Sequence, residues 1–88
     1  MYTYEELETV YVFTCEDVLY YSEPILYIYH ADDGNWLYLC GRNHAGEDAP
    51  CVFLKVIVRI DPSVALLADL PLGKQAKRAS KNDPWEIF

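Results

Sequence analysis

The sequence predicts an α+β fold, in which a small antiparallel sheet built on a central β-hairpin has one or two short helices packed on it. Two β-prone runs, Ile25–His30 and Trp36–Cys40, flank Asp33-Gly34, a dipeptide favoured in two-residue type I′ turns. Asp61-Pro62 is typical of a helix start, with a capping acid before a proline at the first helical position. A chain of 88 residues has room for one hydrophobic core, so residues 1–88 are expected to form a single domain.

The segments before the hairpin are predicted from local signals. Thr9–Thr14 is a run of β-branched and aromatic residues, which indicates a strand. Thr14 is followed by an acid three residues later, which favours Thr14 as the N-cap of a single helical turn over Cys15–Leu19. Glu23-Pro24 closes this segment, because a residue before proline avoids the helical region.

The two-residue turn fixes a register for the predicted hairpin, pairing His30 with Leu37 and Tyr29 with Tyr38. Because side chains alternate along a strand, this register divides the hairpin residues between two faces. One face would carry Leu26, Ile28, His30, Leu37 and Leu39, and the other Tyr27, Tyr29, Trp36, Tyr38 and Cys40. Both sets are largely apolar, so we expect the hairpin to be covered on both sides.

The second half of the chain is less regular. Residues 41–50 form a polar loop without periodicity, whereas residues 51–60 suit either one strand or a short strand followed by a helix. A helix is predicted over residues 62–69, ending before Pro71. Residues 75–80 alternate weakly, and residues 85–88 are expected to form a last short strand.

Composition excludes several classes of protein. The 14 acidic and 7 basic side chains give a formal net charge of −7, which argues against nucleic-acid binding because phosphate contacts need a basic face. The apolar runs are far shorter than the roughly 20 residues of a membrane span, and the first residues do not resemble a secretion signal. Three cysteines, an odd number, suit a reducing compartment, so a cytoplasmic location is expected.

The distribution of charge and aromatic residues favours a role in protein interaction. Ten acids against one arginine lie in residues 1–54, whereas residues 55–88 carry a small positive excess. This asymmetry indicates either two halves that attract each other or an acidic surface that binds a basic protein. The eight tyrosines, three phenylalanines and two tryptophans suggest spare apolar surface for a partner or a homodimer. The candidate interaction residues are Asp32, Asp33, Trp36, His44, Glu47 and Asp48.

Metal binding and catalysis are weaker interpretations. Cys40, His44 and Cys51, with His30 nearby, offer the thiolate and imidazole ligands that zinc prefers, but the paired Cys-x2-Cys spacing of structural zinc sites is missing. Cys40 and His44 also lack the glycine-flanked signature of a thiol nucleophile. We therefore expect a non-enzymatic protein with no catalytic residues, cofactor or metal, and keep a small metal- or ligand-binding domain as the alternative function.

The order of short motifs along the chain resembles a group of short bacterial proteins of unknown function and, more loosely, immunity-protein-like domains. The motifs are Phe13-Thr14-Cys15, Glu23-Pro24-Ile25-Leu26, residues 30–36, Leu39-Cys40-Gly41, His44 with Glu47-Asp48, Asp61-Pro62-Ser63, residues 67–71, Gly73, Arg78 and Asp83-Pro84-Trp85. The resemblance implies a compact α+β domain with an antiparallel sheet, and it favours a helix over residues 54–60. It brings no catalytic residues. An inhibitor role is what analogy with immunity proteins implies.

Overall fold

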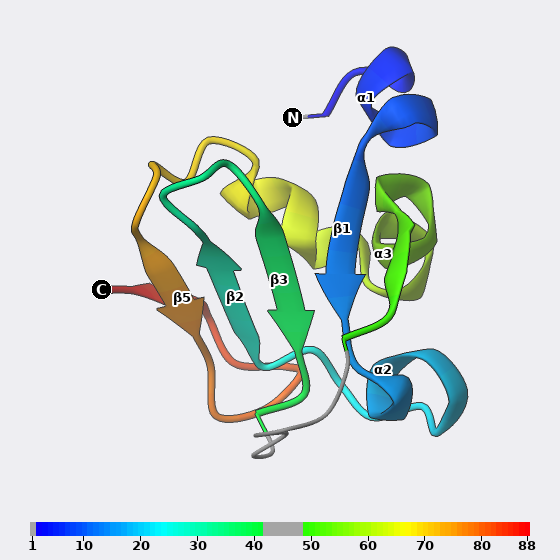
Figure 1. The fold of residues 1–88 in the computed structure, drawn as a ribbon. Helices are drawn as coiled ribbons and strands as arrows, with labels where there is room; N and C mark the ends of the chain where they lie inside the picture. The colour runs from blue at the N-terminus through cyan, green and yellow to red at the C-terminus, as the bar shows by residue number, and fades with distance from the viewer. Residues whose placement is uncertain (1, 42–48) are drawn as a thin grey trace.

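Six strands form one mixed sheet in the computed structural model of the protein, which describes residues 2–41 and 49–88 (Figure 1). They are β1 (Tyr11–Thr14), β2 (Tyr27–His30), β3 (Trp36–Leu39), β4 (Cys51–Phe53), β5 (Gln75–Lys77) and β6 (Glu86–Ile87). Their order across the sheet is β4-β1-β3-β2-β5-β6. β1 and β3 run parallel, and the other neighbouring pairs are antiparallel. The α+β class is confirmed. The prediction of a small antiparallel sheet is wrong, because β1 pairs in parallel with β3, the second strand of the hairpin.

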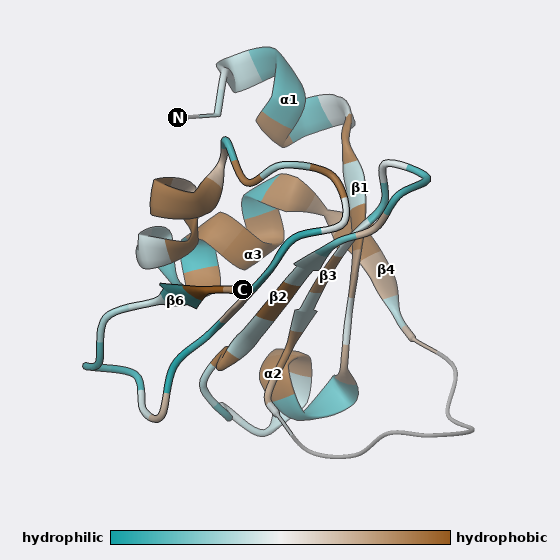
Figure 2. Ribbon diagram, turned by 90° about the vertical axis from the view of Figure 1, so that its left-hand side faces the viewer, coloured by the Kyte–Doolittle hydropathy of each residue, from teal (hydrophilic) through white to brown (hydrophobic). Residues whose placement is uncertain are grey.

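Short helices connect and cover the strands. They are α1 (Tyr4–Thr9), α2 (Glu16–Tyr20), α3 (Leu54–Ile60) and the 3₁₀ helix η1 (Pro62–Leu67). Figure 2 shows α3 and η1 on one side of the sheet, and α2 lies at the end of the sheet that β1 points toward (Figure 1). None of the helices within residues 2–41 and 49–88 is long and apolar enough to cross a membrane.

Capping interactions define where the helices begin. The Thr3 hydroxyl accepts from the Glu6 amide while the Glu6 carboxylate accepts from the Thr3 amide, a capping box that starts α1. No helix is predicted there from the sequence. At α2 the predicted cap is wrong by one residue, since Cys15 occupies the N-cap. The Thr14 hydroxyl instead donates to the Tyr38 carbonyl at 2.6 Å, because Thr14 is buried beside β3.

The ambiguous segment 51–60 is a short strand followed by a helix. β4 ends at Phe53, and α3 buries Leu54 and Ile57, which are spaced by three residues on one helical face. Asp61 then caps η1 by accepting from the Ser63 amide at 3.0 Å, with Pro62 at the first position. The predicted helix start at Asp61-Pro62 is therefore confirmed, although the helix is of the 3₁₀ type.

The hairpin forms where it was predicted, but its register differs by one residue. Tyr29 pairs with Leu37 and His30 with Trp36, so a three-residue loop replaces the predicted two-residue turn. The Ala31 amide donates to the Asn35 carbonyl at 2.8 Å, and Gly34 takes a positive φ of 93°. This is a type I turn followed by a left-handed glycine bulge.

The change in register moves every β3 side chain to the opposite face from the predicted one. Ile28 and Tyr38 now lie together in the core, each with no exposed surface, whereas Tyr27, Tyr29, Leu37 and Leu39 share the other face. The expectation that the hairpin is covered on both sides is confirmed for one side and stays a prediction for the other. The helices of the described residues lie on the Ile28–Tyr38 side of the sheet or at its ends (Figures 1 and 2).

The core lies between the sheet and the helices α3 and η1. Its buried apolar residues are Val12, Cys15, Val18, Ile25, Ile28, Tyr38, Cys40, Leu54, Ile57, Val64, Leu67, Leu70 and Ala76. The Tyr38 hydroxyl reaches the edge of this core, where it lies 3.0 Å from the Tyr2 hydroxyl. Burial, followed by the neighbouring Tyr2, raises the pKa of Tyr38 well above its usual value.

Beside this core, Arg78 is buried together with Asp61, and each of the two is 7% exposed. The Arg78 Nε and Nη2 atoms donate to the Ile25 carbonyl at 3.0 and 2.8 Å. Its Nη1 atom donates to the Ser63 hydroxyl at 3.2 Å and to the Lys81 carbonyl at 3.0 Å. Nη2 also forms an ion pair with Asp61. The guanidinium thus joins the segment before β2, the start of η1 and the C-terminal turn.

Asp61 is held in its charged form by this arrangement. Burial alone would raise the pKa of Asp61, but hydrogen bonds from Ser63 and Arg78 and the positive charge of Arg78 outweigh it and lower that pKa. The same carboxylate therefore caps η1 and compensates the buried guanidinium.

We predict that Arg78→Ala lowers the free energy of unfolding by about 3–5 kcal/mol, because it leaves the Asp61 carboxylate without its cation. Urea denaturation followed by circular dichroism measures this difference. Arg59→Ala makes the same chemical change at an exposed position of α3 and should alter stability by no more than about 0.5 kcal/mol. Equal losses in the two variants would contradict the assigned role of Arg78.

We also predict a pH dependence that comes from Asp61. Its folded-state pKa lies below the unfolded value of about 3.9, so its stabilising effect is complete above about pH 4 and is lost as pH falls through the folded pKa. Wild-type protein should exceed Asp61→Asn in unfolding free energy at neutral pH, and the gap should narrow at about pH 3. A difference in unfolding free energy that is equal at both pH values would refute the role of Asp61. Asp69→Asn, at an exposed site, is the matched control.

Candidate functional site

The side of the sheet away from α3 and η1 carries a group of neighbouring, mainly apolar side chains, which we call the open face. The strand register places eight side chains on it: Tyr11, Phe13, Tyr27, Tyr29, Leu37, Leu39, Cys51 and Phe53. Tyr11 and Cys51 are exposed there, and the other members are half-buried. They come from β1 to β4, the strands on one side of β5. No helix of the described residues lies over this face (Figures 1 and 2).

A stacked aromatic pair lies on the open face. The Tyr11 and Phe53 rings stack with centroids 4.3 Å apart, and Tyr11 is 58% exposed. Lys55 lies with its ammonium 5.7 Å from the Phe53 ring centre, while donating to Glu8 at 3.0 Å. The Tyr27 hydroxyl donates to Gln75 on β5. Tyrosine combines a large apolar ring with a polar tip, so such a surface suits contact with another protein.

The predicted interaction residues do not form one surface. Asp32 and Asp33 are exposed at the tip of the hairpin, with Asp33 accepting from the Asn35 amide at 3.0 Å. The Asp32 carboxylate lies against Gly73, because a Cβ added to Gly73 would stand 2.7 Å from the Asp32 Oδ1 atom. Trp36 is half-buried on the helix-covered face rather than beside Tyr27 and Tyr29. His44, Glu47 and Asp48 lie outside the described residues.

His30 has a structural environment. Its ring stacks on Trp36 with centroids 3.9 Å apart, and its Nδ1 lies 2.6 Å from the Leu70 carbonyl oxygen. A carbonyl only accepts, so Nδ1 carries the hydrogen in this bond. These contacts agree with the interpretation of His30 as a satisfied residue at the rim of the core.

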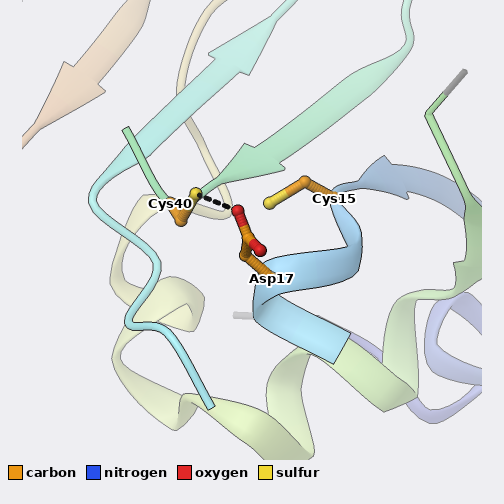
Figure 3. A group of neighbouring side chains, drawn as sticks. All are labelled: Cys15, Asp17 and Cys40. Atoms are coloured by element: carbon orange, nitrogen blue, oxygen red, sulfur yellow. Dashed lines mark hydrogen bonds between the residues drawn. The ribbon is translucent and has the colours of Figure 1, made fainter. Parts of the chain in front are cut away.

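A second group of functional side chains gathers where two parallel strands end (Figure 3). Cys15 directly follows β1 and Cys40 directly follows β3. Because β1 and β3 are parallel neighbours, their carboxyl ends reach the same edge of the sheet. Asp17, in the first turn of α2, projects toward both thiols. We call these three residues the Cys15–Asp17–Cys40 cluster.

The cluster is tight and nearly closed to solvent. One ligand atom from each side chain lies within 4.8 Å of the other two, and the Cys40 Sγ is 3.7 Å from the Asp17 Oδ2. Cys15 and Cys40 are 4% and 5% exposed, and Asp17 is half-buried. The thiols can donate weak hydrogen bonds to the carboxylate, and all three groups are potential metal ligands.

The predicted metal-ligand set of Cys40, His44 and Cys51 is not the set that the structure brings together. Cys40 is buried beside Cys15, whereas Cys51 is exposed and lies on the open face opposite Phe13. His44 lies outside the described residues. Sequence reasoning missed Cys15 and Asp17 as site residues, because their approach to Cys40 depends on the parallel pairing of β1 with β3.

A surface hollow of about 410 Å³ lies on another part of the molecule. Val18 and Leu19 of α2, the segment 22–25, Ile60, Asp61 and Lys81 line it. Asp61 is already engaged by Arg78 and Ser63, and the rest of the lining mixes apolar side chains with Glu23 and Lys81.

Comparison with known proteins gives no independent assignment: no family model, curated protein or solved structure matches the chain. Functional inference therefore depends on the open face and the Cys15–Asp17–Cys40 cluster.

We predict that one of the three thiols reacts rapidly with Ellman's reagent in native, metal-free protein. Cys51 is exposed, whereas Cys15 and Cys40 become accessible only when the structure opens, so their reactions should be slow. The stopped-flow time course should show one fast equivalent and two slow ones. Cys51→Ser should remove the fast phase. A fast phase that survives in this variant would contradict the placement of Cys51.

Proposed function

We propose that the protein is a small non-enzymatic interaction module of the inhibitor type, which binds a basic protein through the open face. The observation that carries this proposal is an aromatic and aliphatic sheet surface that no helix of the described residues covers. Apolar sheet faces are normally buried against a second layer, and an extended exposed apolar patch is typical of an interaction site.

The chemistry of the open face supports protein contact. Tyr11, Tyr27 and Tyr29 supply large rings with few rotatable bonds, which bury area at low cost in conformational entropy. Leu37 and Leu39 add aliphatic surface between them, on the strand at the centre of the face. A cluster of tyrosines around an apolar centre is the pattern of the residues that dominate binding energy in protein interfaces.

Charge indicates which kind of partner fits. The chain carries a net charge of −7, and exposed acids stand at both ends of the strands that build the open face. Asp32 and Asp33 occupy the hairpin tip at one end, and Glu16 follows β1 at the other. Such a charged rim around an apolar centre steers a basic partner into place. Two copies of a chain with a net charge of −7 repel each other, which opposes a homodimer.

A basic surface is what enzymes acting on nucleic acids expose, because they contact phosphates. An acidic module that covers such a surface would block access to the substrate. This gives the inhibitor role a physical basis that does not require any catalytic group in the module itself.

We predict that Tyr11→Ala and Tyr29→Ala each weaken partner binding at least tenfold. Tyr20→Ala, the same change at an exposed residue of α2 away from the open face, should leave binding within twofold. The partner is isolated on immobilised wild-type protein at low salt, identified by mass spectrometry, purified separately and measured by calorimetry. Raising NaCl from about 0.05 M to about 0.5 M should weaken binding, since screening shortens the reach of the charges.

Three results would overturn the proposed function. One is a purified partner with an acidic surface, and another is an affinity that the open-face variants leave unchanged. The third is a homodimer, seen by analytical ultracentrifugation, that Tyr11→Ala or Tyr29→Ala dissociates. Circular dichroism of each variant confirms that its fold is retained before affinities are compared.

A further inference from the structure

We infer that the Cys15–Asp17–Cys40 cluster is a binding site for a thiophilic divalent cation, with Zn²⁺ as the best match. This inference is independent of the proposed interaction function, because the cluster lies at an edge of the sheet and includes no open-face residue. It also differs from the metal site considered from the sequence, of which it retains only Cys40.

The donor set fits zinc in type. Zinc is bound in proteins by cysteine thiolates, histidine nitrogens and carboxylate oxygens, and two thiolates with one carboxylate fall within this set. Hard cations such as Mg²⁺ and Ca²⁺ prefer oxygen ligands, so two sulfur atoms select against them. With three protein ligands, the fourth position of a tetrahedral ion is left for water or another donor.

The distances between the ligand atoms also fit a zinc ion. Zinc–sulfur bonds of about 2.3 Å and zinc–oxygen bonds of about 2.1 Å at a tetrahedral angle place sulfur and oxygen about 3.6 Å apart and two sulfurs about 3.8 Å apart. The Cys40 Sγ and the Asp17 Oδ2 lie 3.7 Å apart, and all three ligand atoms are within 4.8 Å of one another. The side chains therefore stand close to ligand positions without a change of backbone.

The fold holds these groups in place before a cation arrives. Cys15 is the N-cap of α2, but its thiol makes no capping hydrogen bond, and Figure 3 shows it directed toward the other two side chains. The two strands that lead to the cysteines are joined near their ends, since the Thr14 hydroxyl of β1 donates to the Tyr38 carbonyl of β3 at 2.6 Å. Preorganised ligands lose less conformational entropy on binding.

The charge of the donor set suits a divalent cation. Two thiolates and one carboxylate are anionic ligands, and one cation can bind all three together. Cysteine binds a metal through its thiolate, so uptake of the cation releases the two thiol protons to solvent.

The test is a titration of the reduced, chelator-treated protein with Co²⁺ under anaerobic conditions, followed by displacement with Zn²⁺. One equivalent of Co²⁺ should produce a thiolate-to-cobalt charge-transfer band, which one equivalent of Zn²⁺ should abolish. Cys15→Ser and Cys40→Ser should each lose the band, and Asp17→Asn should weaken Co²⁺ binding at least tenfold. Cys51→Ser is the matched control and should keep both band and affinity.

A second measurement uses the wild-type chain alone, in case a variant fails to fold. Bound Zn²⁺ should further slow the reaction of two thiols with Ellman's reagent and leave the third, Cys51, fast. A wild-type Co²⁺ complex without a thiolate band would overturn the inference. So would a band that depends on Cys51, or native protein that forms a Cys15–Cys40 disulfide in air but takes up no metal. Partner binding is not part of either measurement, so failure here is separate from failure of the proposed function.

Discussion

The arrangement of this fold depends on the buried guanidinium of Arg78. Two distant segments supply most of its partners: the carbonyl of Ile25 before β2, and Asp61 with Ser63 at the start of η1. The carbonyl of Lys81, three residues along the chain, accepts a further hydrogen bond. The Cζ atom of Arg78 also lies over the Trp85 ring, 4.2 Å from the ring centre. A lysine has no planar fork and does not reproduce this geometry, so the site is specific to arginine. The end of β5 is thereby joined to the helical layer on one face of the sheet.

Features that depend on neighbouring residues were predictable from the sequence. The hairpin, the Asp61 cap and the start of η1 follow from local turn and capping chemistry. The register did not follow, because Ala-Asp-Asp-Gly-Asn permits either a two-residue or a three-residue loop. The three-residue loop places Tyr38 beside Ile28 in the core and Trp36 beside His30. That preference comes from packing against α3 and η1, which a local pattern does not contain.

The Cys15–Asp17–Cys40 cluster is even less predictable from local sequence patterns. Cys15 and Cys40 are far apart in sequence, and no motif spacing links them. They meet only because β1 inserts parallel to β3, and alternating patterns reveal neither strand order nor strand direction. Cys40 and Cys51, which looked like partners along the chain, are separated by the sheet. The open face was similarly hidden, since the wrong register distributed its residues over both sides of the hairpin.

The two proposed sites share the same pair of strands although they lie on different parts of them. β1 carries Phe13 on the open face and is followed directly by Cys15. β3 carries Leu37 and Leu39 on that face and is followed directly by Cys40. A cation bound by the two cysteines would tie the ends of these strands together and restrain their opening. If this ordering strengthens partner binding at the open face, thermodynamic reciprocity requires the partner to strengthen cation binding by the same factor. The parallel β1–β3 pair is therefore the physical route by which one site can affect the other.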